Sequence, residues 1–128
     1  MRYLSVYDIL AIHYGIIEET GGSHGVREVG LLASAAERPK MKFGGKDLYL
    51  SVFDKAAVYF ESLARHHVFI DGNKRTAFAV AVRFLFVNNY EFSASNSEAE
   101  KFVLKAVVSK LDLKEIVKWF KKNSRKIK

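Results

Sequence analysis

The chain of 128 residues has no cysteine and a single proline. Without cysteine, disulfide bonds and metal sites built from thiolate ligands are excluded, and a reducing compartment is compatible with the composition. Every apolar run is shorter than the roughly 18 residues that a membrane-spanning helix needs. Residues 1–5 also lack the apolar stretch of a signal peptide, so we expect a cytoplasmic protein without a membrane span.

The composition that remains, 49% hydrophobic and 27% charged, is typical of a globular protein. The length fits one domain, residues 1–128, with a sizeable core. A net charge of +7 favours an anionic partner, such as a nucleotide, a nucleic acid or an acidic protein. Part of this charge lies in a C-terminal tail that we expect to be solvated, at Lys118, Lys121, Lys122, Arg125, Lys126 and Lys128.

Capping signals and helical periodicity predict two helices in the first 40 residues. Ser5 can cap the first helix in a capping box with Asp8, and the glycine-rich residues 20–25 end it as a loop. The second helix is expected over about 28–37, because the residue before Pro39 disfavours the helical conformation. Its expected core residues are Val29, Leu31, Leu32 and Ala35.

Residues 40–47 read as a short flap or hairpin, and an amphipathic helix follows over about 48–66. Continuing the apolar stripe of this helix predicts that His67 faces inward at its C-terminal end. The stripe consists of Phe53, Ala56, Ala57, Phe60, Leu63 and Ala64. The side expected to face solvent carries Asp54, Lys55, Glu61, Ser62 and Arg65.

The helix expected over about 74–88 is apolar on nearly all sides and should therefore lie at the centre of the molecule. Two further helices are expected, one capped by Ser95 or Ser97 and one capped by Asp112. The predicted fold class is thus all-α, with about six helices around a central buried helix and a flap-like segment near 40–47.

The densest polar cluster lies just before that central helix. Residues 67–75 combine an imidazole, a carboxylate, a glycine, an amide and two cations. Free N–H groups and the helix dipole favour an anion at such a position, and Gly72 lets the backbone approach a ligand closely. Asn73 can cap the helix. The predicted anion site then consists of the amides of Lys74, Arg75 and Thr76.

The side chains of the cluster suit the transfer of a phosphate group, which needs positioning, charge neutralisation and a base. Lys74 offers a point charge and Arg75 a planar fork for phosphate oxygens. His67 supplies an imidazole that can act as the base. Asp71 can hold a magnesium ion or orient the base. Phe69 is expected to anchor the loop in the core.

Each of these residues also has a structural interpretation, since a histidine can end a helix and Asp-Gly-Asn is a common turn. Cations at a helix N-terminus oppose the helix dipole, however, and this unfavourable choice points to a ligand. The other histidines have no comparable setting. His13 is expected on a helix face and His24 in a loop, while His66 lies about 100° around the helix from the stripe.

Residues 67–78 resemble the Fic/Doc superfamily, and specifically its Doc (death-on-curing) toxin branch. The Fic signature His-x-Phe-x-Asp/Glu-Gly-Asn-Gly-Arg-x-x-Arg is matched at His67, Phe69, Asp71, Gly72, Asn73 and Arg75. Lys74 replaces the second glycine and Phe78 stands at the final arginine, and both departures are what the Doc branch shows. Residues 30–39 also look Doc-like, and the resemblance covers about residues 3–92.

The resemblance implies a Fic fold and an ATP-dependent transferase, with Mg²⁺ as a further expected cofactor. Fic proteins transfer AMP, whereas Doc toxins are similar in fold but phosphorylate a threonine of the translation elongation factor Tu. Doc toxins are neutralised by a Phd-type antitoxin. The self-inhibitory motif Ser/Thr-x-x-x-Glu-Gly/Asn of many Fic proteins is absent from the sequence, which favours inhibition by a separate partner.

We therefore expect a toxin that transfers the ATP γ-phosphate to a Ser/Thr hydroxyl of an elongation factor Tu-like protein and arrests translation. The expected catalytic residues are His67, Asp71, Lys74 and Arg75. The expected nucleotide-binding residues are Gly72, Asn73, Lys74, Arg75 and Thr76, and Asp71 is the expected magnesium ligand.

Two alternatives remain. AMP transfer on the same fold is disfavoured by Phe78, which removes a phosphate ligand. A non-catalytic helical module that binds nucleic acid or protein is disfavoured because its site would be expected to have lost some of the motif residues, which are intact here. Nucleic acid is therefore not expected as a direct substrate.

Overall fold

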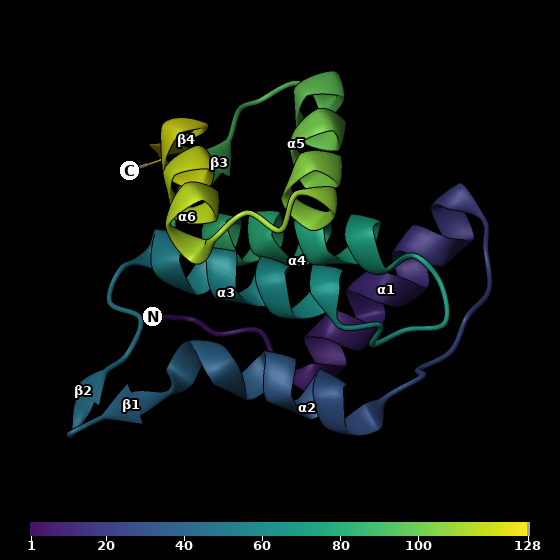
Figure 1. Ribbon diagram of the computed structural model, residues 1–128, viewed down its shortest axis with the longest axis horizontal. Helices are drawn as coiled ribbons and strands as arrows, with labels where there is room; N and C mark the ends of the chain where they lie inside the picture. The colour runs from purple at the N-terminus through teal and green to yellow at the C-terminus, as the bar shows by residue number, and fades with distance from the viewer. Residues whose placement is uncertain (128) are drawn as a thin grey trace.

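The computed structural model describes residues 1–127, and Lys128, the last residue of the expected basic tail, lies outside them. The prediction of an all-α fold with about six helices is confirmed (Figure 1). Over the described residues the elements are α1 (Val6–Thr20), α2 (Val29–Glu37), η1 (Arg38–Lys40, a 3-10 turn), β1 (Lys42–Phe43), β2 (Lys46–Asp47), α3 (Val52–Arg65), α4 (Asn73–Val87), β3 (Tyr90–Phe92), α5 (Asn96–Val108), α6 (Leu113–Lys122) and β4 (Ser124–Lys126).

Side-chain caps begin four of the helices. For α1, α3 and α5, a serine before the helix and an acidic residue three positions on exchange hydrogen bonds in a capping box. Ser51 caps α3, which is why this helix begins later than the residue 48 expected from its periodicity. Of the two candidates for α5, Ser95 is the cap. Helix α6 follows Asp112, whose carboxylate accepts the Glu115 N–H.

Helices α3 and α4 lie side by side in the middle of the molecule, between α1 and α2 on one side and α5 and α6 on the other (Figure 1). Two polar residues of α3, expected to face solvent, are buried instead. Lys55 is 1% exposed, and its ammonium group donates to the carbonyl oxygen of Tyr49 and to Asp47. Ser62 is buried because its hydroxyl accepts a hydrogen bond of 3.0 Å from Arg38. The segment around η1 therefore covers this face of α3, and α3 shares the central position with α4.

Helix α2 lies at the surface and buries a narrower stripe than expected. Leu32 and Ala35 are in the core as predicted, but Leu31 is exposed and Val29 is 72% exposed. The reason is geometric, since this short helix packs against the rest of the molecule with one face only. After it, the flap-like segment forms a hairpin in which β1 pairs antiparallel with β2. Gly44 and Gly45 both have positive φ and make the turn.

Residues 124–126 of the C-terminal tail form a strand, and this was not expected. Strand β4 pairs antiparallel with β3, so that Tyr90 lies opposite Lys126 and Phe92 opposite Ser124. The basic side chains of the tail that are described are exposed, as the sequence predicts. Strands of three residues carry too few positions for an alternating pattern, so the sequence offers no signal for this sheet.

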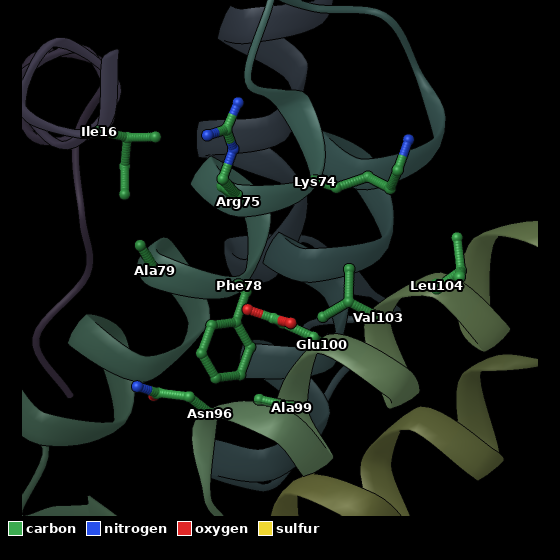
Figure 2. Close-up of a pocket in the computed structure, with 10 residues that line it drawn as sticks. All are labelled: Ile16, Lys74, Arg75, Phe78, Ala79, Asn96, Ala99, Glu100, Val103 and Leu104. Atoms are coloured by element: carbon green, nitrogen blue, oxygen red, sulfur yellow. The ribbon is translucent and has the colours of Figure 1, made fainter. Parts of the chain in front are cut away.

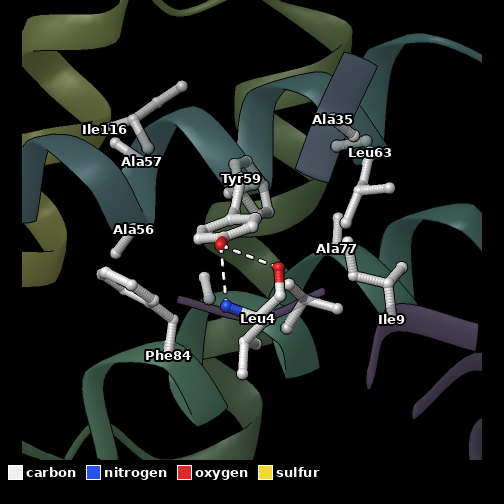
Figure 3. Close-up of a cluster of buried hydrophobic side chains, with 14 of the residues drawn as sticks. Leu4, Ile9, Ala35, Ala56, Ala57, Tyr59, Leu63, Ala77, Phe84 and Ile116 are labelled. Carbon is white, nitrogen blue, oxygen red and sulfur yellow. Dashed lines mark hydrogen bonds between the residues drawn. The ribbon is translucent and has the colours of Figure 1, made fainter. Parts of the chain in front are cut away.

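Tyr59 joins the N-terminal segment to the core (Figure 3). Its Oη donates to the carbonyl oxygen of Leu4 at 3.1 Å and accepts from the Leu4 N–H at 2.9 Å. The ring is wholly buried and packs on Phe84, with the ring centroids 5.0 Å apart. Burial in apolar surroundings raises the pKa of Tyr59 to about 12.

Tyr59→Phe should destabilise the protein by about 1–3 kcal/mol, because it leaves buried backbone groups of Leu4 unpaired. Urea denaturation at pH 7 measures this, with Tyr7→Phe as the control, since Tyr7 is 81% exposed. A raised pKa favours the neutral phenol in the folded state. The stability of the wild type should therefore fall as the pH rises from about 10 towards 12, and Tyr59→Phe should lose less over this range. If Tyr59→Phe and Tyr7→Phe lost the same free energy of unfolding at pH 7, this role for Tyr59 would be contradicted.

Candidate active site

The motif loop, defined here as residues 66–72, connects α3 to α4. Helix α3 ends at Arg65, and His66 has already left the helical conformation, with φ −107° and ψ 110°. The predicted inward orientation of His67 is therefore wrong: the apolar stripe does not continue through a residue outside the helix, and His67 is exposed. His66 is also exposed, but it lines a different cleft, between α2 and α3, beside Leu31 and Met41.

The loop is held to α4 by the side chain of Asn73. Its Oδ1 accepts from the Phe69 N–H and its Nδ2 donates to the Phe69 carbonyl oxygen, both at 2.9 Å. The prediction that Asn73 caps α4 is thus wrong, because Asn73 is the first residue of the helix and its side chain bonds the loop instead. Gly72 occupies the N-cap position with φ +76°, a conformation that glycine adopts without strain. Phe69 is 1% exposed and anchors the loop in the core as predicted.

A second segment, residues 22–28, clamps the motif loop from outside by backbone hydrogen bonds. The N–H of Ile70 donates to the Gly25 carbonyl oxygen at 3.0 Å, and Val26 forms an isolated β-bridge with Phe69. The carbonyl oxygen of Val68 accepts from the N–H groups of residues 27 and 28 at 2.8 and 3.1 Å. This glycine-rich segment was expected only to end α1, yet it forms the outer support of the site.

Two glycines of the clamp lie against side chains of the motif loop. A Cβ atom at Gly22 would lie 2.5 Å from Oδ2 of Asp71, and one at Gly25 would lie 2.7 Å from Cδ1 of Ile70. Both glycines also have positive φ, at 117° and 129°. The run of glycines at 21, 22 and 25 was the available signal in the sequence, but a glycine run does not say which segment it will touch.

His13 of α1 supports the loop from the inner side, and sequence reasoning missed it. The ring is 4% exposed and stacks on Phe69 with the centroids 3.8 Å apart and the planes at 5°. Its Nε2 lies 2.8 Å from the carbonyl oxygen of Asp71. A carbonyl oxygen can only accept, so Nε2 carries the hydrogen. The spacing from Ile9 to His13 to Ile17, four residues each, placed it on the buried face of α1.

Asp71 is partly exposed and ionised. Its carboxylate accepts hydrogen bonds from the N–H groups of Ser23 at 3.2 Å and of Gly72 at 2.8 Å. These bonds, with smaller contributions from Arg75 and His13, hold the pKa of Asp71 below its usual range. Among the described residues, no hydrogen bond joins Asp71 to His67.

A magnesium ion would find one carboxylate at this position rather than a cage of protein ligands. No group of three or more His, Asp or Glu side chains that could hold a metal ion occurs within residues 1–127. The ionised Asp71 alone still fits magnesium, because this ion is commonly held by one or two carboxylates together with phosphate oxygens and water.

The first turn of α4 presents Lys74 and Arg75 to solvent. Thr76 was predicted to contribute its amide to the anion site, and this prediction is wrong. Its N–H already donates to the Gly72 carbonyl oxygen at 3.0 Å, and its side chain is fully buried. The backbone N–H groups left for an anion are those of residues 73–75, one position earlier than expected, because Gly72 rather than Asn73 is the N-cap.

A cleft of about 390 Å³ opens beside these cations, between α4 and α5 (Figure 2). Lys74 and Arg75 lie at one end, and the ring of Phe78 lies inside (Figure 2). Phe78 is fixed by an edge contact with Phe92 at 5.2 Å between ring centroids. The other lining residues are Ile16, Ala79, Asn96, Ala99, Glu100, Val103 and Leu104. The cleft is mostly apolar, and apart from the two cations the polar side chains among these lining residues are Asn96 and Glu100. The sequence alone did not predict it.

Comparisons with known proteins identify a family and two relatives that this chain is similar to. The model of the Fic/DOC family matches residues 3–85. The chain is 47% identical over 74 residues to "Toxin Doc" of Mycolicibacterium smegmatis, which covers 58% of this chain and 57% of that protein. It is 31% identical over 91 residues to "Protein kinase doc" of Escherichia phage P1, covering 71% of each. The first alignment thus spans little more than half of its relative.

Asp71→Asn should lower stability at neutral pH, because an amide cannot accept from both N–H groups. A depressed pKa means that the carboxylate contributes stability above its unfolded-state pKa, about 4, and that this contribution is lost as the pH falls through the lower folded value. The difference between wild type and variant should therefore be largest near pH 7 and shrink towards pH 3. Thermal unfolding across this range measures it, with the exposed Glu19→Gln as control. A difference that grows on acidification would refute the assigned hydrogen bonds.

Proposed function

Since the chain belongs to the Fic/DOC family, we propose that it is a Doc-type toxin that transfers the γ-phosphate of ATP to a Ser/Thr hydroxyl of a protein. One observation carries the proposal. Lys74, Arg75 and the free N–H groups of the α4 N-terminus meet at the end of an apolar cleft. This arrangement joins an anion site to a space for a nucleoside, and the relative from phage P1 is named a protein kinase.

The nucleotide would lie with its base in the cleft and its phosphates towards the motif loop. A volume of about 390 Å³ with apolar walls is within the range of small-molecule sites. Asn96 and Glu100 are the polar side chains that could bind the edge of a base. The charge of the phosphates would meet Lys74, Arg75 and the positive end of the α4 dipole.

In the proposed reaction His67 takes the proton from the substrate hydroxyl as its oxygen attacks the γ-phosphorus. The bond from this phosphorus to the β–γ bridging oxygen breaks, and ADP leaves. Lys74 and Arg75 neutralise charge on the phosphate oxygens during the transfer. A magnesium ion, when bound at Asp71, would supply further charge neutralisation. The exposure of His67 suits a base that must meet a hydroxyl on the surface of another protein.

The partners belong to the same proposal. We infer an elongation factor Tu-like substrate and a Phd-type antitoxin, in keeping with the relative named as a toxin. A net charge of +7 favours an acidic, amphipathic inhibitory segment. The β1–β2 hairpin is a candidate contact, since Lys42, Lys46 and Phe43 are exposed on it. No helix within residues 1–127 is long and apolar enough to cross a membrane.

Incubation with a cytosolic extract and ATP labelled at either the α or the γ position distinguishes the two possible transfers. We expect label from γ-labelled ATP only, and an added phosphate on the target by mass spectrometry. The reason is Phe78, which replaces a cationic phosphate ligand and is fixed among aromatic side chains. Label from α-labelled ATP with an added AMP would establish AMP transfer instead.

His67→Ala should lower the transfer rate by about 10²–10⁴, the usual contribution of a general base, and should abolish growth arrest. His66→Ala is the matched control, because His66 is also exposed but lines the cleft between α2 and α3. Both variants should keep the melting temperature of the wild type. Full activity in His67→Ala, with loss in His66→Ala, would transfer the role of base to His66.

A further inference from the structure

The peptide group between Asp71 and Gly72 is held at both of its ends. Its carbonyl oxygen accepts from Nε2 of His13 at 2.8 Å. Its N–H, which belongs to Gly72, donates to Oδ1 of Asp71 at 2.8 Å. The plane of this peptide is therefore fixed by one bond from α1 and one bond within the loop.

This peptide directly precedes the N–H groups proposed to bind phosphate. Gly72 is the N-cap residue of α4, and its φ of +76° sets the direction in which the chain enters the helix. Glycine can also adopt negative φ at little cost, so rotation of this peptide would not be prevented by Gly72 itself. A restraint from outside the loop is needed to keep one orientation.

His13 has the properties of such a restraint. Its ring lies flat against Phe69 and is buried, so that it cannot turn away from the carbonyl oxygen. A Cβ atom at Gly72 would lie 2.9 Å from Cδ1 of Ile17, so α1 also contacts the N-cap glycine directly. If packing alone were required, an apolar ring would serve at position 13. The bond to the Asp71 carbonyl oxygen needs a donor there.

We propose that His13 is a positioning residue of the phosphate-binding loop, acting through the hydrogen bond from Nε2 to the Asp71 carbonyl oxygen. It does not touch the nucleotide or the substrate hydroxyl. It keeps the N–H groups of residues 73–75 directed at the phosphates. The inference rests on the proposed function only in taking the anion to be ATP.

Two substitutions separate the hydrogen bond from the packing. His13→Phe keeps a ring that can stack on Phe69 but removes the donor. His13→Gln removes the ring but places an amide N–H near the position of Nε2. The exposed Tyr7→Phe is the control for a substitution elsewhere on α1. The measurements are kcat and KM for ATP in γ-phosphate transfer, the melting temperature, and hydrogen exchange of the Gly72 amide.

For His13→Phe we expect a melting temperature no lower than that of His13→Gln, a fall in kcat/KM for ATP of roughly 10–100-fold, and faster exchange at Gly72. The magnitude follows from the cost of misplacing a binding group by about 1 Å. His13→Gln should recover most of the activity and the slow exchange despite losing the ring. If His13→Phe does not fold, His13→Asn replaces it, because its shorter side chain places the amide away from the Asp71 carbonyl oxygen.

Wild-type kinetics and exchange in His13→Phe would overturn the inference. The inference would also be overturned if kcat/KM fell equally in His13→Phe and His13→Gln, in proportion to the loss of melting temperature. His13 would then be a packing residue only. If the wild type itself transfers no phosphate, the proposed function fails, and the exchange at Gly72 still decides whether His13 positions the loop.

Discussion

The candidate site depends on the backbone hydrogen bonds that join two loops, residues 22–28 and the motif loop. The clamp at residues 22–28 binds the motif loop through backbone groups, and Gly22 and Gly25 face atoms that a Cβ would meet at 2.5 and 2.7 Å. His13 of α1 and Asn73 of α4 also form hydrogen bonds with the motif loop, so three separate segments support it. A segment so restrained can present unpaired N–H groups and cations without rearranging when an anion binds, which lowers the cost of binding.

The positive charges of the site do not stabilise the fold, but they favour the binding of an anion. Lys74 and Arg75 lie in the first turn of α4, where the helix dipole repels positive charge. Asp71 offsets part of this charge and is itself kept ionised by two N–H donors. Exposed cations at such a position contribute little to stability. Their presence is better explained by an anionic ligand, whose charge is attracted by every group that the turn presents.

Much of the fold could be predicted from the sequence, because serine caps and helical periodicity are local signals. The errors share a cause, which is that neighbours distant in sequence decide the outcome. Lys55 is buried because residues 47 and 49 supply oxygen atoms to its ammonium group. The His67 prediction was wrong because α3 ends at Arg65, two residues before the position that the apolar stripe would reach. The predictions for Asn73 and Thr76 failed for the same reason. The N-cap is Gly72, one residue before the predicted Asn73, and the free N–H groups therefore also lie one residue earlier.

The support of the site was harder to predict than its chemical groups. A contiguous motif such as residues 67–75 can be recognised in the sequence alone. The clamp, His13 and the cleft arise from three separate parts of the chain, and nothing in their local sequence says that they meet. The glycine run and the histidine on the apolar face of α1 were visible but ambiguous, because the same residues occur in loops and cores without any site.

The two walls of the cleft come from different parts of the chain, α4 and α5, and this bears on how such proteins diversify. The family match ends at residue 85, and it therefore contains His67, Lys74, Arg75 and the wall of the cleft formed by α4. The facing wall, with Asn96 and Glu100, belongs to α5 and lies beyond that match. Under the proposed function, the part that handles phosphates and the part that surrounds the base are separate in sequence. Substitution in α5 could then alter which nucleotide is accepted while the transfer chemistry is inherited intact, so donor choice could evolve independently of the reaction.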